Sequence, residues 1–97
     1  MDYRVEKNGY DLFIEQRKNS VKQQILEQYM LLRKERAITQ QEIAERTGMK
    51  RTNIARIESG KNMPTIEVLV KLATSLDMEL KISLVDKKEK IEENLND

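Results

Sequence analysis

Apolar positions follow a helical period over most of the chain. The first clear segment has apolar residues three or four positions apart: Val21, Ile25, Tyr29 and Leu32. This spacing predicts a helix from Ser20 to about Arg36, and Ser20 with Gln23 forms a capping-box pattern at its start. Residues 1–19 are then an N-terminal extension with one or two helical turns, and its small apolar stripe consists of Tyr10, Phe13 and Ile14.

A short second helix is predicted over residues 40–47. Thr39 and Glu42 form another capping box at its start. Gly48 follows its last turn and suits the left-handed position just past a helix end. Ile43 and Ala44 give this helix a narrow inner face.

A third helix is expected to begin at Lys50 or Arg51, after a connection of about three residues, and to end at Gly60. Ile54 and Ile57 lie three positions apart, so only one narrow side of this helix packs inward. Its outer side carries short polar residues and arginines: Arg51, Thr52, Asn53 and Arg56. Two short helices with a tight glycine-containing connection form a helix-turn-helix unit, in which the second helix can enter the DNA major groove.

Pro64 prevents the third helix from continuing, and Thr65 caps a fourth. The fourth helix is the most apolar in the chain: Ile66, Leu69, Val70, Leu72, Ala73 and Leu76. It is therefore expected to cross the middle of the core.

Beyond the fourth helix the period changes. Residues 79–85, ELKISLV, alternate apolar and polar side chains, which is a strand pattern. A fifth helix is the competing interpretation, because Leu76, Leu80 and Leu84 also lie four apart. We favour the strand. Residues 86–97 form a charged tail that is expected to fray.

The composition leaves few functional classes. The 97 residues suffice for one domain with a modest core. The chain has no cysteine and no histidine, which removes the thiolate and imidazole ligands of metals and the commonest general base. Neither a metal site, a cofactor nor enzymatic activity is expected. Without a membrane-length apolar stretch or an apolar signal region, we expect a cytoplasmic protein with no membrane partner.

The net charge is only +1, but it is unevenly distributed. Residues 21–36 carry four basic and two acidic side chains, a balance of +2. Residues 37–62 carry five and three, again +2, whereas residues 86–97 carry three and five, a balance of −2. The mildly basic middle can offer a binding face to an anionic partner.

The segment LRKERAITQQEIAERTGMKRTNIARIESGKNMPTIEVLVKLATSLDM carries a specific pattern over about half the chain. Its pattern residues are Leu32, Arg33, Thr39, Gln40, Glu42, Ile43, Ala44, Gly48, Ile54, Arg56, Ile57, Glu58, Gly60, Lys61 and Pro64. With this spacing the segment resembles the Xre/Cro/C1-type helix-turn-helix domain of phage and bacterial repressors. The resemblance implies an all-α, lambda-repressor-like bundle of four to five helices, with residues 20–78 as the DNA-binding domain and double-stranded DNA as the partner.

The resemblance also implies roles for individual residues. Gln40 matches a phosphate-binding glutamine, and Arg51 and Thr52 match positions that reach base edges. The full set of candidate DNA-binding residues is Gln40, Lys50, Arg51, Thr52, Asn53, Arg56, Lys61 and Asn62. Arg33 and Glu58 match a partly buried ion pair between the first and third helices, so their role is expected to be structural.

Some of these residues also have a plainer interpretation. Arg51 and Arg56 could be plain solvated charges. Gln40 could merely be a helix-start residue, and Lys61 a loop lysine without a role. Two positions depart from the family pattern. Ala37 replaces a common glycine, and Lys50 replaces a capping serine or threonine, which leaves the start of the third helix open by one residue.

A single strand needs a partner, and the simplest is the same strand of a second copy. A homodimer would also read a palindromic operator. The strand and the N-terminal extension resemble antitoxins of the HigA type, which bind their own operator and a toxin; the segment YDLFIEQ would then contact the toxin. The alternatives are a stand-alone or phage-type repressor without a toxin, and a protein-interaction module on the same fold.

Overall fold

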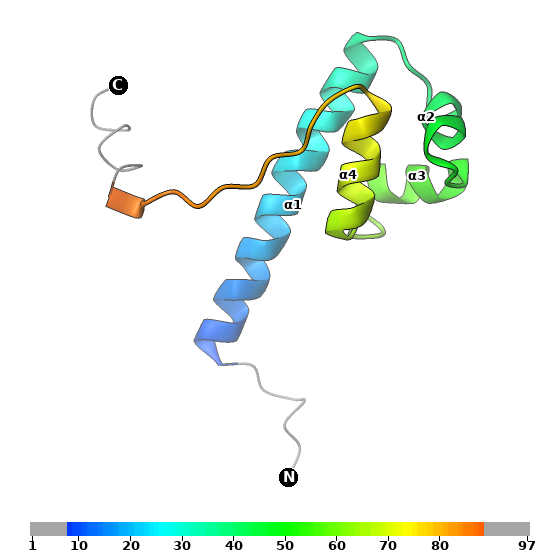
Figure 1. Cartoon of the computed structure of the whole chain (residues 1–97). Helices are drawn as coiled ribbons and strands as arrows, with labels where there is room; N and C mark the ends of the chain where they lie inside the picture. The colour runs from blue at the N-terminus through cyan, green and yellow to red at the C-terminus, as the bar shows by residue number, and fades with distance from the viewer. Residues whose placement is uncertain (1–7, 89–97) are drawn as a thin grey trace.

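The computed structural model describes residues 8–88, and Figure 1 shows the helices of that range. They are α1 (Gly9–Glu35), α2 (Gln40–Thr47), α3 (Arg51–Glu58) and α4 (Ile66–Ser75). The three shorter helices gather beside the C-terminal half of α1, and the N-terminal half of α1 projects away from them (Figure 1). The predicted all-helical bundle is confirmed. Within the described range, no helix is both long enough and apolar enough to cross a membrane.

Helix α1 begins at Gly9, so the predicted start at Ser20 is wrong. The side chain of Asn8 caps the helix, because its Oδ1 accepts a hydrogen bond from the backbone N–H of Asp11 at 2.8 Å. No proline interrupts the chain before Arg36, so the helix continues through Ser20. Inside a continuous helix the backbone N–H groups already have partners, and the capping box at Ser20 has nothing to cap.

The core lies where all four helices meet. Its buried apolar residues are Leu26, Tyr29, Ile43, Ala44, Ile54, Ile57, Leu69, Leu72 and Leu76. Ile43 of α2 and Ile54 of α3 are fully buried. Each of these short helices therefore turns its narrow apolar side inward, as the sequence predicted, and the opposite side of each faces solvent.

The connection between α2 and α3 is built by local hydrogen bonds. Thr39 accepts from the N–H of Glu42 at 3.0 Å and so caps α2. Gly48 ends α2 in the left-handed region at φ 75°, where a side chain would be strained. The hydroxyl of Thr47 donates to the carbonyl of Ile43 at 2.8 Å and accepts from the N–H of Met49 at 3.2 Å. These contacts confirm the predicted cap, stop and three-residue connection.

Residues 79–86 are extended but pair with no other segment among residues 8–88, so the predicted strand is not found there. The competing fifth helix is not found there either. The physical reason is that strand pairing needs a second extended segment, and within one described chain this stretch has none. Most of the tail predicted from residue 86 lies outside the described range.

The turn between α1 and α2 contains a strained residue. Ala37 has φ 55°, in the left-handed region that costs a residue with a Cβ about 1–2 kcal/mol. The turn is held by hydrogen bonds from the N–H of Ala37 to Lys34 and from the N–H of Ile38 to Arg33, both at 3.0 Å. The alanine thus adopts a conformation that suits the glycine of the family pattern.

We expect Ala37→Gly to raise the free energy of unfolding by roughly 0.5–1 kcal/mol, because relief of the left-handed strain exceeds the extra chain entropy of glycine. Urea unfolding followed by circular dichroism measures it. Ala55→Gly, inside α3, is the matched control and should destabilise by about 1 kcal/mol. A loss of stability in Ala37→Gly would contradict the strain interpretation.

Candidate nucleic-acid interface

The outer side of α3 carries four of the residues that the sequence proposes for DNA contact. Arg51, Thr52, Asn53 and Arg56 are all exposed, whereas Ile54 and Ile57 of the same helix are buried. The two isoleucines hold α3 against the core and leave no freedom to rotate the polar side inward. The helix therefore presents a fixed row of two guanidinium groups, one amide and one hydroxyl.

Lys50 stands at the start of this row. Its backbone carbonyl accepts from the N–H groups of Asn53 and Ile54 at 3.0 and 3.1 Å, so α3 starts at Arg51 and Lys50 is its N-cap. The Lys50 side chain makes no capping hydrogen bond and is exposed. The open question about the helix start is thereby settled, and the ammonium group is free to extend toward a ligand.

Shallow hollows flank the start of α3. One is lined jointly by α2, the turn and α3, and includes Gln41, Glu45 and Arg51. Another is lined by Lys50, Thr52, Asn53 and Arg56 alone. The structure thus brings these four candidates together on one surface, beside the polar side of α2.

Lys61 and Asn62 lie in the loop that follows α3. Gly60 turns the chain at φ 84°, and the backbone N–H groups of Lys61 and Asn62 then donate to the carbonyl of Arg56 at 2.9 and 3.3 Å. Both side chains are exposed. The loop is therefore tied to the last turn of α3 by its backbone, and its side chains stand at the opposite end of α3 from Lys50.

Arg33 and Glu58 form the ion pair that connects α1 with α3. The guanidinium Nη2 lies 2.6 Å from Glu58 Oε1, and Nε lies 2.9 Å from Oε2. Arg33 Nη1 also donates to the carbonyl of Ile38 at 2.8 Å. The exposed fractions of the two side chains are 10% and 5%. This two-pronged geometry fixes α1, the turn before α2 and the end of α3 relative to one another.

Tyr29 belongs to the same cluster, and the sequence did not reveal it. Its hydroxyl donates to Glu58 Oε2 at 3.0 Å. Burial, and then the negative charge of Glu58, raise the pKa of the Tyr29 hydroxyl above its usual value, so it stays protonated and remains a donor. The available signal was that Tyr29 precedes Arg33 by four residues, which places both on one side of a helix.

Gln40, the first residue of α2, faces the ion pair as well as solvent. Its Nε2 donates to Glu58 Oε1 at 3.3 Å, and its side chain is half-buried. The side-chain amide has two N–H groups. Glu58 therefore orients the amide while one N–H remains for an outside acceptor, next to the free backbone N–H groups at the start of α2.

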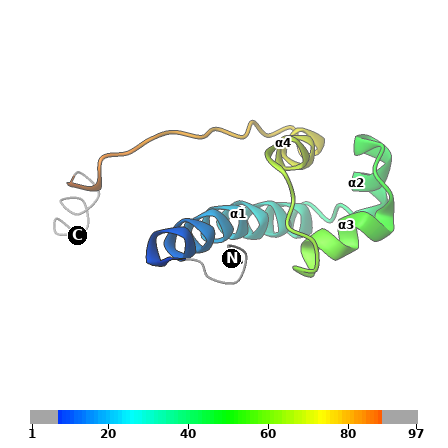
Figure 2. The ribbon, with the colours of Figure 1, turned by 90° about the horizontal axis from the view of Figure 1, so that it is seen from below.

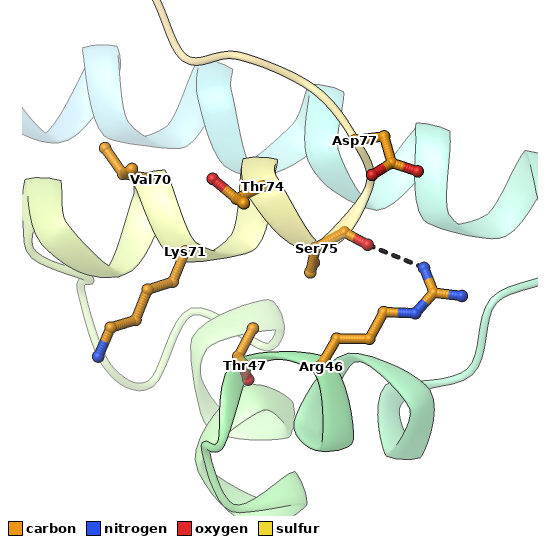
Figure 3. A pocket seen from close by; sticks show the side chains of 7 residues that line it. All are labelled: Arg46, Thr47, Val70, Lys71, Thr74, Ser75 and Asp77. Carbon is orange, nitrogen blue, oxygen red and sulfur yellow. Dashed lines mark hydrogen bonds between the residues drawn. The ribbon is translucent and has the colours of Figure 1, made fainter.

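A separate hollow lies between α2 and α4, and none of the candidate DNA-binding residues lines it. Figure 3 shows Arg46 reaching across it, and the guanidinium donates to the backbone carbonyl of Ser75 at 2.8 Å. Lys71 and Thr47 border the same hollow. This contact joins α2 to the end of α4, so we assign Arg46 a role in packing.

Comparison with protein families supports what the geometry indicates. The family model for helix-turn-helix proteins matches residues 30–82, which is more than half of the chain. The chain belongs to this helix-turn-helix family. It is a DNA-binding transcriptional regulator, as the resemblance to the Xre/Cro/C1-type repressors implied. No curated protein and no solved structure matches this helix-turn-helix regulator significantly.

Removing one member of the ion pair should strongly destabilise the fold of this regulator. We expect Arg33→Met to lower the free energy of unfolding by about 3–5 kcal/mol, because it leaves the Glu58 carboxylate buried without its cation. The double variant Arg33→Met/Glu58→Leu should lose less than Arg33→Met alone, since no charge is then left unpaired. Urea unfolding of both variants measures the difference. A loss below about 1 kcal/mol in Arg33→Met would show that the pair is not a structural constraint.

Proposed function

We propose that the protein is a sequence-specific repressor that binds a palindromic operator as a homodimer, with α3 as the reading helix. The observation that carries this proposal is the division of α3 into a buried side with Ile54 and Ile57 and an exposed side with arginine, threonine and asparagine. A helix held in this way can enter the major groove, which is about 12 Å wide.

Each candidate residue has a chemical role in this proposal. Arg51 at the start of α3 can bond O6 and N7 of a guanine with two N–H groups, and Thr52 can contact a thymine methyl. Asn53 and Arg56 reach bases or phosphates further along the groove. Gln40 binds a phosphate with the N–H that Glu58 leaves free.

The remaining cationic and amide groups position the protein on the DNA backbone. Lys50 and Lys61 are exposed at the two ends of α3, close to where the two strands of a groove would pass. Asn62 lies beside Lys61 in the loop that is tied to Arg56. Such contacts set affinity and register without reading sequence.

Dimerisation is part of the proposal because a palindrome presents two half-sites about 34 Å apart. Within the described range, residues 79–86 are extended and lack a backbone partner. The same segment of a second copy can supply one, which gives an isologous dimer with two reading helices.

An antitoxin role is the second candidate function. It is favoured by exposed apolar side chains near the start of α1, above all Tyr10, Phe13 and Ile14, which suit a protein partner. Co-purification of a small ribonuclease with the protein from its native host would support this role. Purification without such a protein would favour a stand-alone or phage-type repressor.

The reading role predicts different effects for two basic residues. On a DNA site selected from a random library, Arg51→Ala should relax preference at one base-pair position, a loss of roughly 1–3 kcal/mol in discrimination. Lys61→Ala should weaken binding to all DNA sequences alike. It should also reduce the salt dependence of binding by the amount that corresponds to about one phosphate contact. Fluorescence anisotropy at several salt concentrations measures both.

Lys18→Ala, on the projecting half of α1, is the matched charge control and should leave binding unchanged. If Arg51→Ala kept both affinity and preference, α3 would not be the reading helix. If neither the wild type nor any variant bound DNA, a protein-interaction module would be favoured instead.

The strand role predicts the oligomeric state. A chain ending at Met78 lacks residues 79–97 and should be monomeric, because it has lost the extended segment that pairs between copies. Light scattering coupled to size-exclusion chromatography measures the mass of both chains. An unchanged dimer mass after truncation would place the interface elsewhere.

A further inference from the structure

The N-terminal half of α1 projects beyond the core. Leu26 is its first buried residue, so residues 9–25 extend about 25 Å away from the other helices. Figure 1 shows this part of α1, which we call the arm, without another helix beside it. A single helix of this length is only marginally stable in water unless one side is packed.

One side of the arm is apolar and exposed. Tyr10, Ile14 and Val21 have exposed fractions of 71%, 45% and 44%. They follow one another at intervals of four and seven residues, so they lie in one line along the helix. The line continues into Ile25 and Leu32, which are partly buried against the core.

The extended segment after α4 passes over this same side of α1. Leu80, Ile25 and Leu32 line the same small cavity. The segment therefore begins beside the apolar line of α1. Near the beginning of α1, Lys87 Nζ lies 6.0 Å from the centre of the Phe13 ring. Figure 2 shows the segment leaving the bundle on the same side as the arm, and Figure 1 shows that the two then diverge.

Between these two contacts the segment does not cover the arm. Ile82 and Leu84 share the side of Leu80 through their alternation, yet their exposed fractions are 67% and 102%. Two apolar rows, one on the arm and one on the segment, are therefore both open. The segment also offers backbone groups that find no partner within the described chain.

We infer that the occupant of this surface is a second copy of the chain, whose residues 79–86 pair antiparallel with the same residues of the first and lie across both arms. This inference rests on the proposed dimer and assigns its interface. The dimer is then held by two strands and two arms together.

The sequence of the segment is complementary to itself in one register. With Ile82 opposite Ile82, Leu80 lies opposite Leu84 and Lys81 opposite Ser83. Leu80, Ile82 and Leu84 then all fall on the side that faces the arms. A register centred on Lys81 would instead place two lysines directly opposite each other, which is unfavourable. A shift of the strand pairing by an odd number of residues would place apolar side chains opposite polar ones.

The strands alone would make a weak interface. An isolated pair of strands is marginally stable in water, and packing against a helix is one way to stabilise it. A specific stable interface buries about 1,200–2,000 Å². The arm surface around Ile14 and Val21 extends the contact from the strand pair toward that size.

The arm is tested by comparing two double variants of the full chain by sedimentation equilibrium. Ile14→Ala/Val21→Ala removes apolar surface from the proposed interface and should weaken dimerisation at least tenfold. Gln16→Ala/Asn19→Ala changes the opposite, exposed side of the same helix and should leave it unchanged. Alanine is the best helix former, so neither change should unwind the arm, and circular dichroism checks this.

The register is tested by single cysteines, since the chain contains none. Ile82→Cys should form a disulfide between copies upon oxidation, because the two residues lie opposite each other. Ser83→Cys should not, because its two copies would be separated by more than the about 7 Å that a disulfide can span. Cross-linking of Ser83→Cys alone would overturn the register.

The other outcomes separate this inference from the function on which it rests. If the chain ending at Met78 were monomeric and Ile14→Ala/Val21→Ala stayed as dimeric as the wild type, the arm would be excluded and the strand dimer would stand. If the arm variant kept its dimer but lost a toxin that co-purifies with the wild type, the arm would belong to that toxin. A wild-type monomer at high concentration would overturn both proposals.

Discussion

The ion pair between Arg33 and Glu58 is the constraint on which the arrangement of the helix-turn-helix depends. It joins α1 to the last residue of α3, and the second amino group of the arginine holds the turn before α2. Glu58 also accepts from Tyr29 and Gln40. A buried carboxylate with this many donors tolerates few alternative positions of the surrounding helices. The pair therefore contributes less to net stability than to fixing geometry.

The ion pair also connects the buried core with the exposed side of α3. The core takes up Ile54 and Ile57 of α3, and the ion pair takes up Glu58. Arg51, Thr52, Asn53 and Arg56 remain exposed for contact with a ligand. Gln40 connects the two regions, since its amide donates to Glu58 while its side chain is only half-buried. A shift of the ion pair would displace Gln40 and α3 together.

Local signals predicted the centre of the chain well. Thr39, Gly48, Pro64 and Thr65 act through their own backbone surroundings, so their effects could be inferred before the fold was known. The start of α1 could not, because the pattern at Ser20 is a true capping pattern that a continuous helix overrides. The strand was not found for a different reason, since residues 79–86 meet no second extended segment within the described range. Tyr29 and the link from Gln40 to Glu58 involve residues distant in sequence, which no local pattern reveals.

The central claim is that the exposed side of α3 lies against base pairs. Amide chemical-shift changes in an NMR titration with the selected duplex test it most directly. We expect the largest changes along Lys50–Arg56 and at Gln40, and small ones over residues 9–21 of the arm. Changes confined to the arm and to residues 79–86, with α3 unaffected, would contradict the claim.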